Sequence, residues 1–151
     1  LLAPAAMSAL REKLIPRALI VTPNMPEAAA LLDAPLAQGV ADMIGQGQEL
    51  LRLGAPYVLI KGGHGTSDTS TDVLVSSAGV QEFSVPRVMT QNTHGTGCTL
   101  SSAIAAGLAR GMTLHQAISA AKAYVTEALK HSHALRIGQG HGPVHHFYRW
   151  W

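Results

Sequence analysis

The chain has 151 residues, of which 47% are hydrophobic and 13% charged, and its formal net charge at pH 7 is +2. These values are typical of one globular domain with a sizeable core and argue against a disordered chain. The Lys and Arg residues form no run, and no apolar stretch approaches the span of a bilayer, so we expect neither a nucleic-acid nor a membrane partner.

The cysteine content and the first residue give two further expectations. Cys98 is the only cysteine, so a disulfide within the chain is impossible. This favours a reducing compartment, and we expect a cytoplasmic protein. The chain begins with Leu1 rather than Met, and we therefore expect a processed, cleaved or partial chain.

The first part of the chain alternates apolar runs with segments that have helical spacing. Met7, Leu10 and Leu14 share one helical face, and Pro16 is expected to end that helix. Short, continuously apolar runs are typical of strands buried in a parallel sheet. Helices are predicted at 1–14, 28–32 and 41–53, and strands at 18–22 and 55–60. This order predicts an α/β fold with a mainly parallel sheet.

The second part is expected to contain a hairpin and two helices. The polar loop 65–70 is a candidate mobile flap. Residues 72–75 and 80–85 flank a turn and predict an antiparallel hairpin at a sheet edge. An apolar helix is predicted to end at Gly111, and a second helix is predicted at 114–130.

The most informative segment is Asn92 to Leu100 (NTHGTGCTL), where two glycines precede the Ala- and Leu-rich residues 101–109. We predict a tight loop that opens directly into a buried helix. A helix start presents unpaired N–H groups and the positive end of the helix dipole, so it favours an anion such as phosphate. Cys98 would lie in the first turn, where the same dipole stabilises a thiolate. A glycine-containing connection before a core helix is the alternative interpretation.

Two other segments at predicted strand ends allow two interpretations each. Asn24 and Glu27 have the spacing of a helix-capping pair, and they also lie where open α/β sheets bind ligands. Lys61 and Gly62 follow the second strand, either as a surface turn or as an ammonium and a bare backbone near a phosphate.

The C-terminal segment is rich in glycine and histidine. Residues 137–143 have the spacing of a nucleotide-binding loop, but we expect no strand before it and no helix after it, which argues against a dinucleotide site. Five of the eight histidines lie between His131 and His146. No cysteine or carboxylate cluster joins them, so we interpret them as a polar tail rather than a metal site.

Four motifs in order resemble the hydroxymethylpyrimidine/phosphomethylpyrimidine kinases of thiamine biosynthesis, in the ribokinase superfamily. They are TPNMPEA from Thr22, KGGH from Lys61, NTHGTGCTL from Asn92 and GPVHHFY from Gly142. The resemblance covers nearly the whole chain and is to the C-terminal part of that family. It implies that residues 1–151 are the C-terminal part of one three-layer α/β/α kinase domain, with most of the pyrimidine pocket upstream.

The resemblance also implies a reaction and roles for single residues. The implied reaction is ATP-dependent phosphorylation of 4-amino-5-hydroxymethyl-2-methylpyrimidine and of its monophosphate. The implied cofactors are ATP and Mg²⁺, and the complete enzyme is expected to be a homo-oligomer. The implied catalytic residues are Cys98 as the base and Gly95, Thr96 and Gly97 as the anion hole. The implied nucleotide contacts are Lys61, Gly62, Thr22 and Asn24, and the implied Mg²⁺ side is Glu27 with Asn24.

Three alternatives remain open. A pyridoxal or pyridoxine kinase of the same superfamily would have the same motifs. Cys98 with His94 could form a thiol nucleophile and its base, although His94 is expected to lie outside the helix. An inactive nucleotide-binding fragment is the third possibility.

Overall fold

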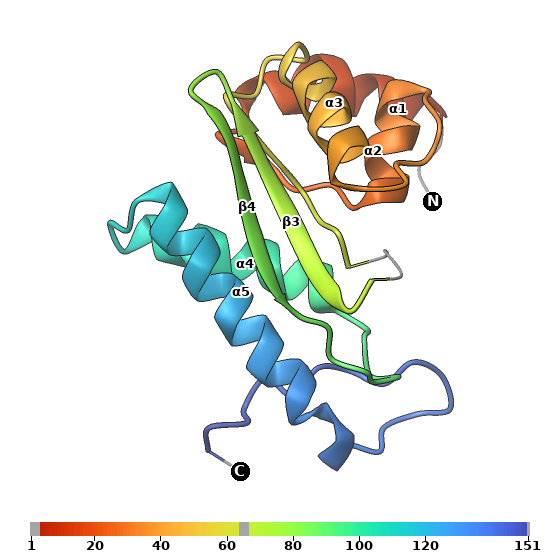
Figure 1. Cartoon of the computed structure of the whole chain (residues 1–151), viewed down its shortest axis with the longest axis vertical. Helices are drawn as coiled ribbons and strands as arrows, with labels where there is room; N and C mark the ends of the chain where they lie inside the picture. The colour runs from red at the N-terminus through yellow and green to blue at the C-terminus, as the bar shows by residue number, and fades with distance from the viewer. Residues whose placement is uncertain (1–3, 64–66, 151) are drawn as a thin grey trace. The chain divides into compact units, whose positions relative to one another are not determined.

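The computed structural model describes residues 4–63 and 67–150 (Figure 1). The chain divides into two compact units, Leu1–Arg87 and Val88–Trp151. Residues 65 and 66 of the predicted flap (65–70) lie outside the described residues, and Thr69 and Ser70 at its end belong to a strand.

The first unit contains a four-stranded sheet in the order β1-β2-β3-β4. The strands are β1 (Ile20–Val21), β2 (Tyr57–Ile60), β3 (Thr69–Ser76) and β4 (Gly79–Pro86). The pair β1–β2 is parallel, whereas β2–β3 and β3–β4 are antiparallel. The predicted hairpin is therefore confirmed and is longer than expected.

The sheet is mixed in the described residues, where the sequence predicted a mainly parallel one. Only β1 and β2 are joined by helices, which parallel neighbours require as a crossover. Only residues 61–68 separate β2 from β3, which is too short for a crossover, and short connections join antiparallel strands. β1 is also shorter than predicted because Pro23 has no N–H group to continue the ladder. The pairing resumes at one isolated bridge, between Asn24 and Lys61.

Three helices of this unit pack on one face of the sheet (Figure 1). They are α1 (Pro4–Ala9), α2 (Met25–Leu32) and α3 (Val40–Leu51). α1 continues as one π-helical segment and a 3₁₀ turn through Arg17, so Pro16 does not end the helical region where predicted. Proline is tolerated there because the first residues of a turn need no N–H partner. The core consists of buried side chains such as Leu31, Met43 and Leu50 against Val58, Ile60 and Val73.

The second unit is a helical hairpin of α4 (Thr96–Ala109) and α5 (Leu114–Lys130), followed by a 3₁₀ turn at Ser132–Ala134. Gly111 has a φ of 84° between the helices, which confirms the predicted stop. The helices approach closely, since a Cβ added to Gly107 would lie 3.0 Å from the Cβ of Ala117. Ile118, Ala121 and Val125 share one face of α5 and are buried, whereas Leu129 on the same face is half-buried.

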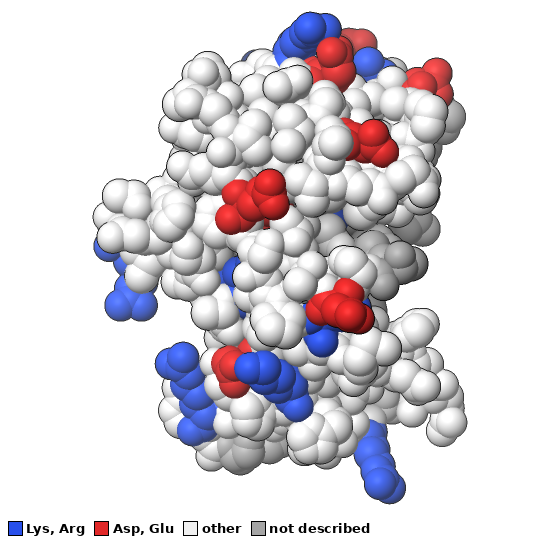
Figure 2. Space-filling view, in the orientation of Figure 1, with Lys and Arg blue, Asp and Glu red and all other residues white. Residues whose placement is uncertain are grey.

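Figure 2 shows the charged side chains on one face of the molecule. On the face drawn in Figure 2, Lys and Arg side chains are interspersed with Asp and Glu, and the described residues there form no continuous basic band. Within the described ranges, no helix is both long and apolar enough to cross a membrane.

Candidate functional site

Asn24 and Glu27 form the predicted capping pair at the start of α2. The Oδ1 atom of Asn24 accepts a hydrogen bond of 2.8 Å from the N–H of Glu27, and Glu27 Oε2 accepts one of 2.7 Å from the N–H of Asn24. This reciprocal pair satisfies two N–H groups that a helix start otherwise leaves unpaired. The capping interpretation is confirmed, and it leaves Glu27 Oε1 outside the hydrogen bonds and ion pairs of the described residues.

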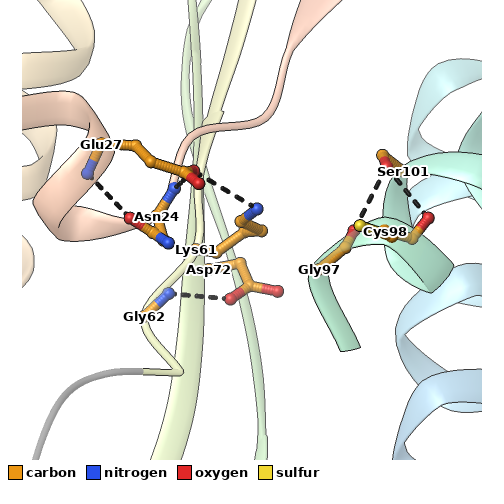
Figure 3. Close-up of polar contacts among 8 residues, drawn as sticks. All are labelled: Asn24, Glu27, Lys61, Gly62, Asp72, Gly97, Cys98 and Ser101. Atoms are coloured by element: carbon orange, nitrogen blue, oxygen red, sulfur yellow. Dashed lines mark hydrogen bonds and ion pairs between the residues drawn. The ribbon is translucent and has the colours of Figure 1, made fainter. Parts of the chain in front are cut away.

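Lys61 joins this pair through the strand pairing. Its N–H donates to the carbonyl of Pro23 at 2.9 Å, which continues the parallel ladder and sets Lys61 beside Asn24. Its Nζ lies 3.7 Å from Glu27 Oε2. Figure 3 shows this ion pair as a dashed line. The Lys61 side chain is 16% exposed and that of Glu27 56% exposed. An ammonium and a carboxylate therefore meet at the carboxyl ends of two parallel strands, where open α/β sheets bind ligands.

Gly62 is required by the packing of its own chain. It is buried, and its N–H donates to the Oδ1 atom of Asp72 at 3.0 Å (Figure 3). A Cβ at this position would collide with the carbonyl oxygen of Thr71. Asp72 is only 4% exposed, and its carboxylate fixes the backbone directly after Lys61. Asp72 was not predicted as a functional residue, although a carboxylate directly before the apolar residues 73–75 was a usable signal.

Arg87 holds the connection between β2 and β3 and was also missed. Its Nε donates to the carbonyl of Ser67 at 2.6 Å, its Nη1 to that of Gly63 at 2.7 Å and its Nη2 to that of Thr69 at 3.1 Å. One guanidinium thus binds three backbone carbonyls close to Gly62, using the fixed fork of its donors. A single arginine has no sequence pattern that would predict such a contact.

In the second unit, residues 95–98 form the predicted loop and helix start. Gly95 has a φ of 84°, a left-handed conformation that favours glycine, and α4 begins at Thr96. The N–H of Thr99 donates to the carbonyl of Gly95 at 2.8 Å. In the part of the chain that the structure describes, the N–H groups of Gly97 and Cys98 have no acceptor. The Cys98 side chain is exposed beside them.

The hydroxyl groups around this loop bind carbonyls rather than the free N–H groups. Thr96 Oγ1 donates to the carbonyl of Thr93 at 2.6 Å, and Ser101 Oγ lies 3.2 Å from the carbonyl oxygen of Gly97 and 3.1 Å from that of Cys98 (Figure 3). The helix start therefore keeps two N–H donors and the positive end of the dipole for an anion.

The remaining expectations concern histidines and Thr22. His94 precedes α4, as predicted. Among the described residues, no group of three or more His, Cys, Asp or Glu side chains could hold a metal ion. Thr22 follows β1 and is half-buried.

An open depression of about 570 Å³ in the second unit is lined by Met89, Thr90, Gln91, Asn92, His133 and Leu135.

The chain is similar to known proteins along nearly all of its length. The sequence profile of the family described as phosphomethylpyrimidine kinase matches residues 1–145. The hydroxymethylpyrimidine/phosphomethylpyrimidine kinases of Escherichia coli (strain K12) and Rhizobium meliloti (strain 1021) are 48% and 50% identical to it over 151 residues. Each match covers 100% of this chain and 57% of the relative, so the chain spans little more than half the length of these curated relatives.

Solved structures give the same result for the fold. The pyridoxal kinase of Bacillus subtilis, in an ADP complex, has a TM-score of 0.90 and 37% identity and covers 97% of this chain and 56% of its own. The phosphomethylpyrimidine kinase of Clostridium difficile 630 has a TM-score of 0.71 and 39% identity. The match covers 86% of this chain and 51% of that kinase. These ribokinase-like neighbours confirm the predicted fold class. The match of the family profile over residues 1–145 carries the assignment further, and the chain belongs to the phosphomethylpyrimidine kinase family.

Proposed function

We propose that this chain takes part in the ATP-dependent phosphorylation of 4-amino-5-hydroxymethyl-2-methylpyrimidine and of its monophosphate, which supplies the pyrimidine for thiamine diphosphate. The observation that carries the proposal is the start of α4, where an exposed thiol lies beside the N–H groups of Gly97 and Cys98, which have no acceptor among the described residues. The similarity to hydroxymethylpyrimidine/phosphomethylpyrimidine kinases at 48% to 50% identity supports the choice of substrate.

The residues present fit ATP and Mg²⁺ by the chemistry of their donors. Glu27 and Asn24 have the hard oxygen atoms that Mg²⁺ prefers, and a hydrated ion needs only one or two such protein ligands. Lys61 adds an ammonium at the same strand ends. The nucleotide supplies the phosphoryl group, and the ion neutralises its charge. Thr22 and Gly62 are proposed as further contacts at this edge of the sheet.

The roles of the α4 residues follow from what phosphoryl transfer requires. The substrate hydroxyl forms the new O–P bond as the bond to the leaving ADP breaks, and its proton needs an acceptor. We assign that role to the Cys98 thiolate, which the helix start favours. The backbone of Gly95, Thr96, Gly97 and Cys98 would donate to the phosphate oxygens as charge develops on them.

A pyridoxal kinase is the second candidate, because the similar structures include pyridoxal kinases at TM-scores of 0.90 and 0.91. The two reactions need the same phosphate side and differ in the alcohol. The proposal also includes a cytoplasmic location, a homo-oligomer and a place for the chain within one kinase domain.

The test is an ADP-release assay on the purified 151-residue chain, with the pyrimidine alcohol, its monophosphate and pyridoxal in parallel. Isothermal titration with ADP and with AMP-PCP measures nucleotide binding separately, and the Escherichia coli relative serves as the positive control. Turnover of the pyrimidine supports the proposal, and preferential turnover of pyridoxal supports the second candidate. Binding without any turnover would indicate an inactive nucleotide-binding fragment, and no binding at all would overturn the assignment.

A further inference from the structure

The C-terminal segment at residues 142–144 pairs with the backbone directly before the α4 loop. The N–H of His94 donates to the carbonyl of Gly142 at 3.0 Å, and the N–H of Val144 donates to the carbonyl of His94 at 3.3 Å. Both backbone groups of His94 are therefore held by the tail. The next residue is Gly95, whose left-handed conformation directs the chain into α4.

The side chain of Asn92 links the segment before α4 to the residues that follow α5. Its Nδ2 donates to the carbonyl of Ser132 at 2.5 Å and to that of Leu135 at 3.2 Å. Its own N–H donates to Thr90 Oγ1 at 3.1 Å. Because the amide group is bound on its nitrogen side, the position of its Oδ1 atom is fixed as well.

Gly142 is in contact with this fixed side chain. A Cβ added to Gly142 would overlap Asn92 Oδ1, and it would lie 2.7 Å from Asn92 Cγ. An exposed side chain would normally move aside, but Asn92 cannot do so without losing its hydrogen bonds to Ser132 and Leu135. The glycine is thus required by close packing in a buried position.

The tail is anchored to α5 beyond this point. Val144 is only 1% exposed, the N–H of His145 donates to the carbonyl of Ala128 at 3.1 Å, and the hydroxyl of Tyr124 donates to the carbonyl of His146 at 3.0 Å. The tail therefore links α5 to the residues that precede α4.

We propose that Asn92 and Gly142 are positioning residues for the anion-binding start of α4, through the backbone of His94. This inference rests on the proposed nucleotide-binding function. N–H groups at a helix start stabilise a phosphate only if they point at the place it occupies, and a shift of about 1 Å can cost on the order of a hundredfold in rate. The hydrogen bonds from residues 142–144 fix the backbone of His94, and the turn into α4 begins at the next residue, Gly95.

The experiment compares Gly142→Ala with Gly140→Ala in the 151-residue chain. Gly140 is the matched control, because a Cβ there meets nothing within 4 Å. We expect Gly142→Ala to weaken ADP binding by about tenfold or more. The Gly140→Ala variant should bind ADP like the wild type. Titration at a temperature at which each variant is fully folded, as checked by circular dichroism, separates positioning from a general loss of stability.

Two further measurements test the mechanism. Amide hydrogen exchange should show faster exchange at His94 and Val144 in Gly142→Ala only. The second measurement is a double mutant. Asn92→Ala removes the side chain that a Cβ at position 142 would meet, so Gly142→Ala should have no further effect in its presence. Asn92→Ala/Gly142→Ala should therefore bind ADP about as well as Asn92→Ala alone. Unchanged ADP affinity in Gly142→Ala, despite faster exchange at His94, would overturn the inference. A wild-type chain that binds no ADP would instead overturn the proposed function.

Discussion

Cys98 can be tested apart from the helix to which it belongs, because a substitution of its side chain keeps the N–H groups beside it. We expect Cys98→Ala to lower turnover by about 10² to 10⁴, the usual contribution of a general base, while ADP binding changes by less than about threefold. Cys98→Asp should recover part of the rate, since a carboxylate at a helix start is ionised and accepts protons.

The measurements are the ADP-release rate and ADP titration for both variants, in the most active form of the chain. Turnover of Cys98→Ala at the wild-type rate would exclude Cys98 as the base. A rate for Cys98→Asp below that of Cys98→Ala would count against proton transfer at this position.

Glu27 has a structural role that a neutral side chain can also fill. Glutamine can still accept the N–H of Asn24, so Glu27→Gln should lower the free energy of unfolding by less than about 1 kcal/mol. It removes the charge that a hydrated Mg²⁺ would sense, so the Mg²⁺ concentration for half-maximal rate should rise severalfold.

Glu49→Gln is the matched control, since Glu49 is an exposed carboxylate on α3 that forms an ion pair with Arg52. Its Mg²⁺ dependence should equal that of the wild type. If Glu27→Gln lowers the melting temperature strongly and leaves the Mg²⁺ dependence unchanged, Glu27 is only a capping residue.

The residues that the sequence predicted and those that it missed differ in how far along the chain their hydrogen-bond partners lie. The capping pair was predictable because Asn24 and Glu27 are three positions apart and follow a local rule. The side-chain hydrogen bonds described above for Asp72, Arg87 and Asn92 reach partners ten to forty-three residues away. Such contacts depend on the completed fold, and a single polar residue in the sequence does not indicate them.

At the scale of elements, the two glycines after β2 make a matched pair. A Cβ on Gly62 would meet the Thr71 carbonyl, whereas one on Gly63 meets nothing within 4 Å. Gly62→Ala should move the backbone and weaken its hydrogen bond to Asp72. The expected loss is roughly 2 to 4 kcal/mol of unfolding free energy.

Urea unfolding of both variants measures this difference. Gly63→Ala should remain within about 0.5 kcal/mol of the wild type. Equal stabilities for the two variants would show that the β3 backbone adjusts freely and that Gly62 is not required by packing.

Helices and strands were predicted better than their pairing. The capped helices α2 and α5 and the hairpin follow from local spacing and turn residues. The direction of β2 relative to β3 does not, because it depends on whether the connection crosses over the sheet. An apolar run such as Tyr57–Ile60 is the same in a parallel or an antiparallel neighbourhood.

At the scale of the whole molecule, coverage of the relatives and the sheet edge lead to one prediction. The chain spans 57% of the Escherichia coli relative, and in the described residues β1 pairs with β2 alone. An open strand edge can pair with another chain. We therefore expect the purified 151-residue chain to associate and to turn over the pyrimidine far more slowly than the full-length relative.

Size-exclusion chromatography and the ADP-release assay check this expectation, with and without co-expression of the part of the Escherichia coli relative that lies outside the match. Co-expression should raise both the monodisperse fraction and the rate. A monodisperse 151-residue chain with the full rate of the relative would show that its substrate pocket lies within these residues.

The register of the sheet also implies an order of assembly. Ser76 pairs with Gly79 across a tight turn, so β3 and β4 can zip together within microseconds. Ile20 pairs with Tyr57 only after α2 and α3 have closed the crossover between them, and the ladder from Pro23 to Lys61 depends on that step. Pulse-labelling exchange should therefore protect the amide of Leu74, which faces Gln81 in a hydrogen-bonded pair of the hairpin, before that of Lys61. The corner that brings Asn24, Glu27 and Lys61 together would then be the last part of the first unit to mature, and a nascent or partly unfolded chain would have its hairpin before it had this binding edge.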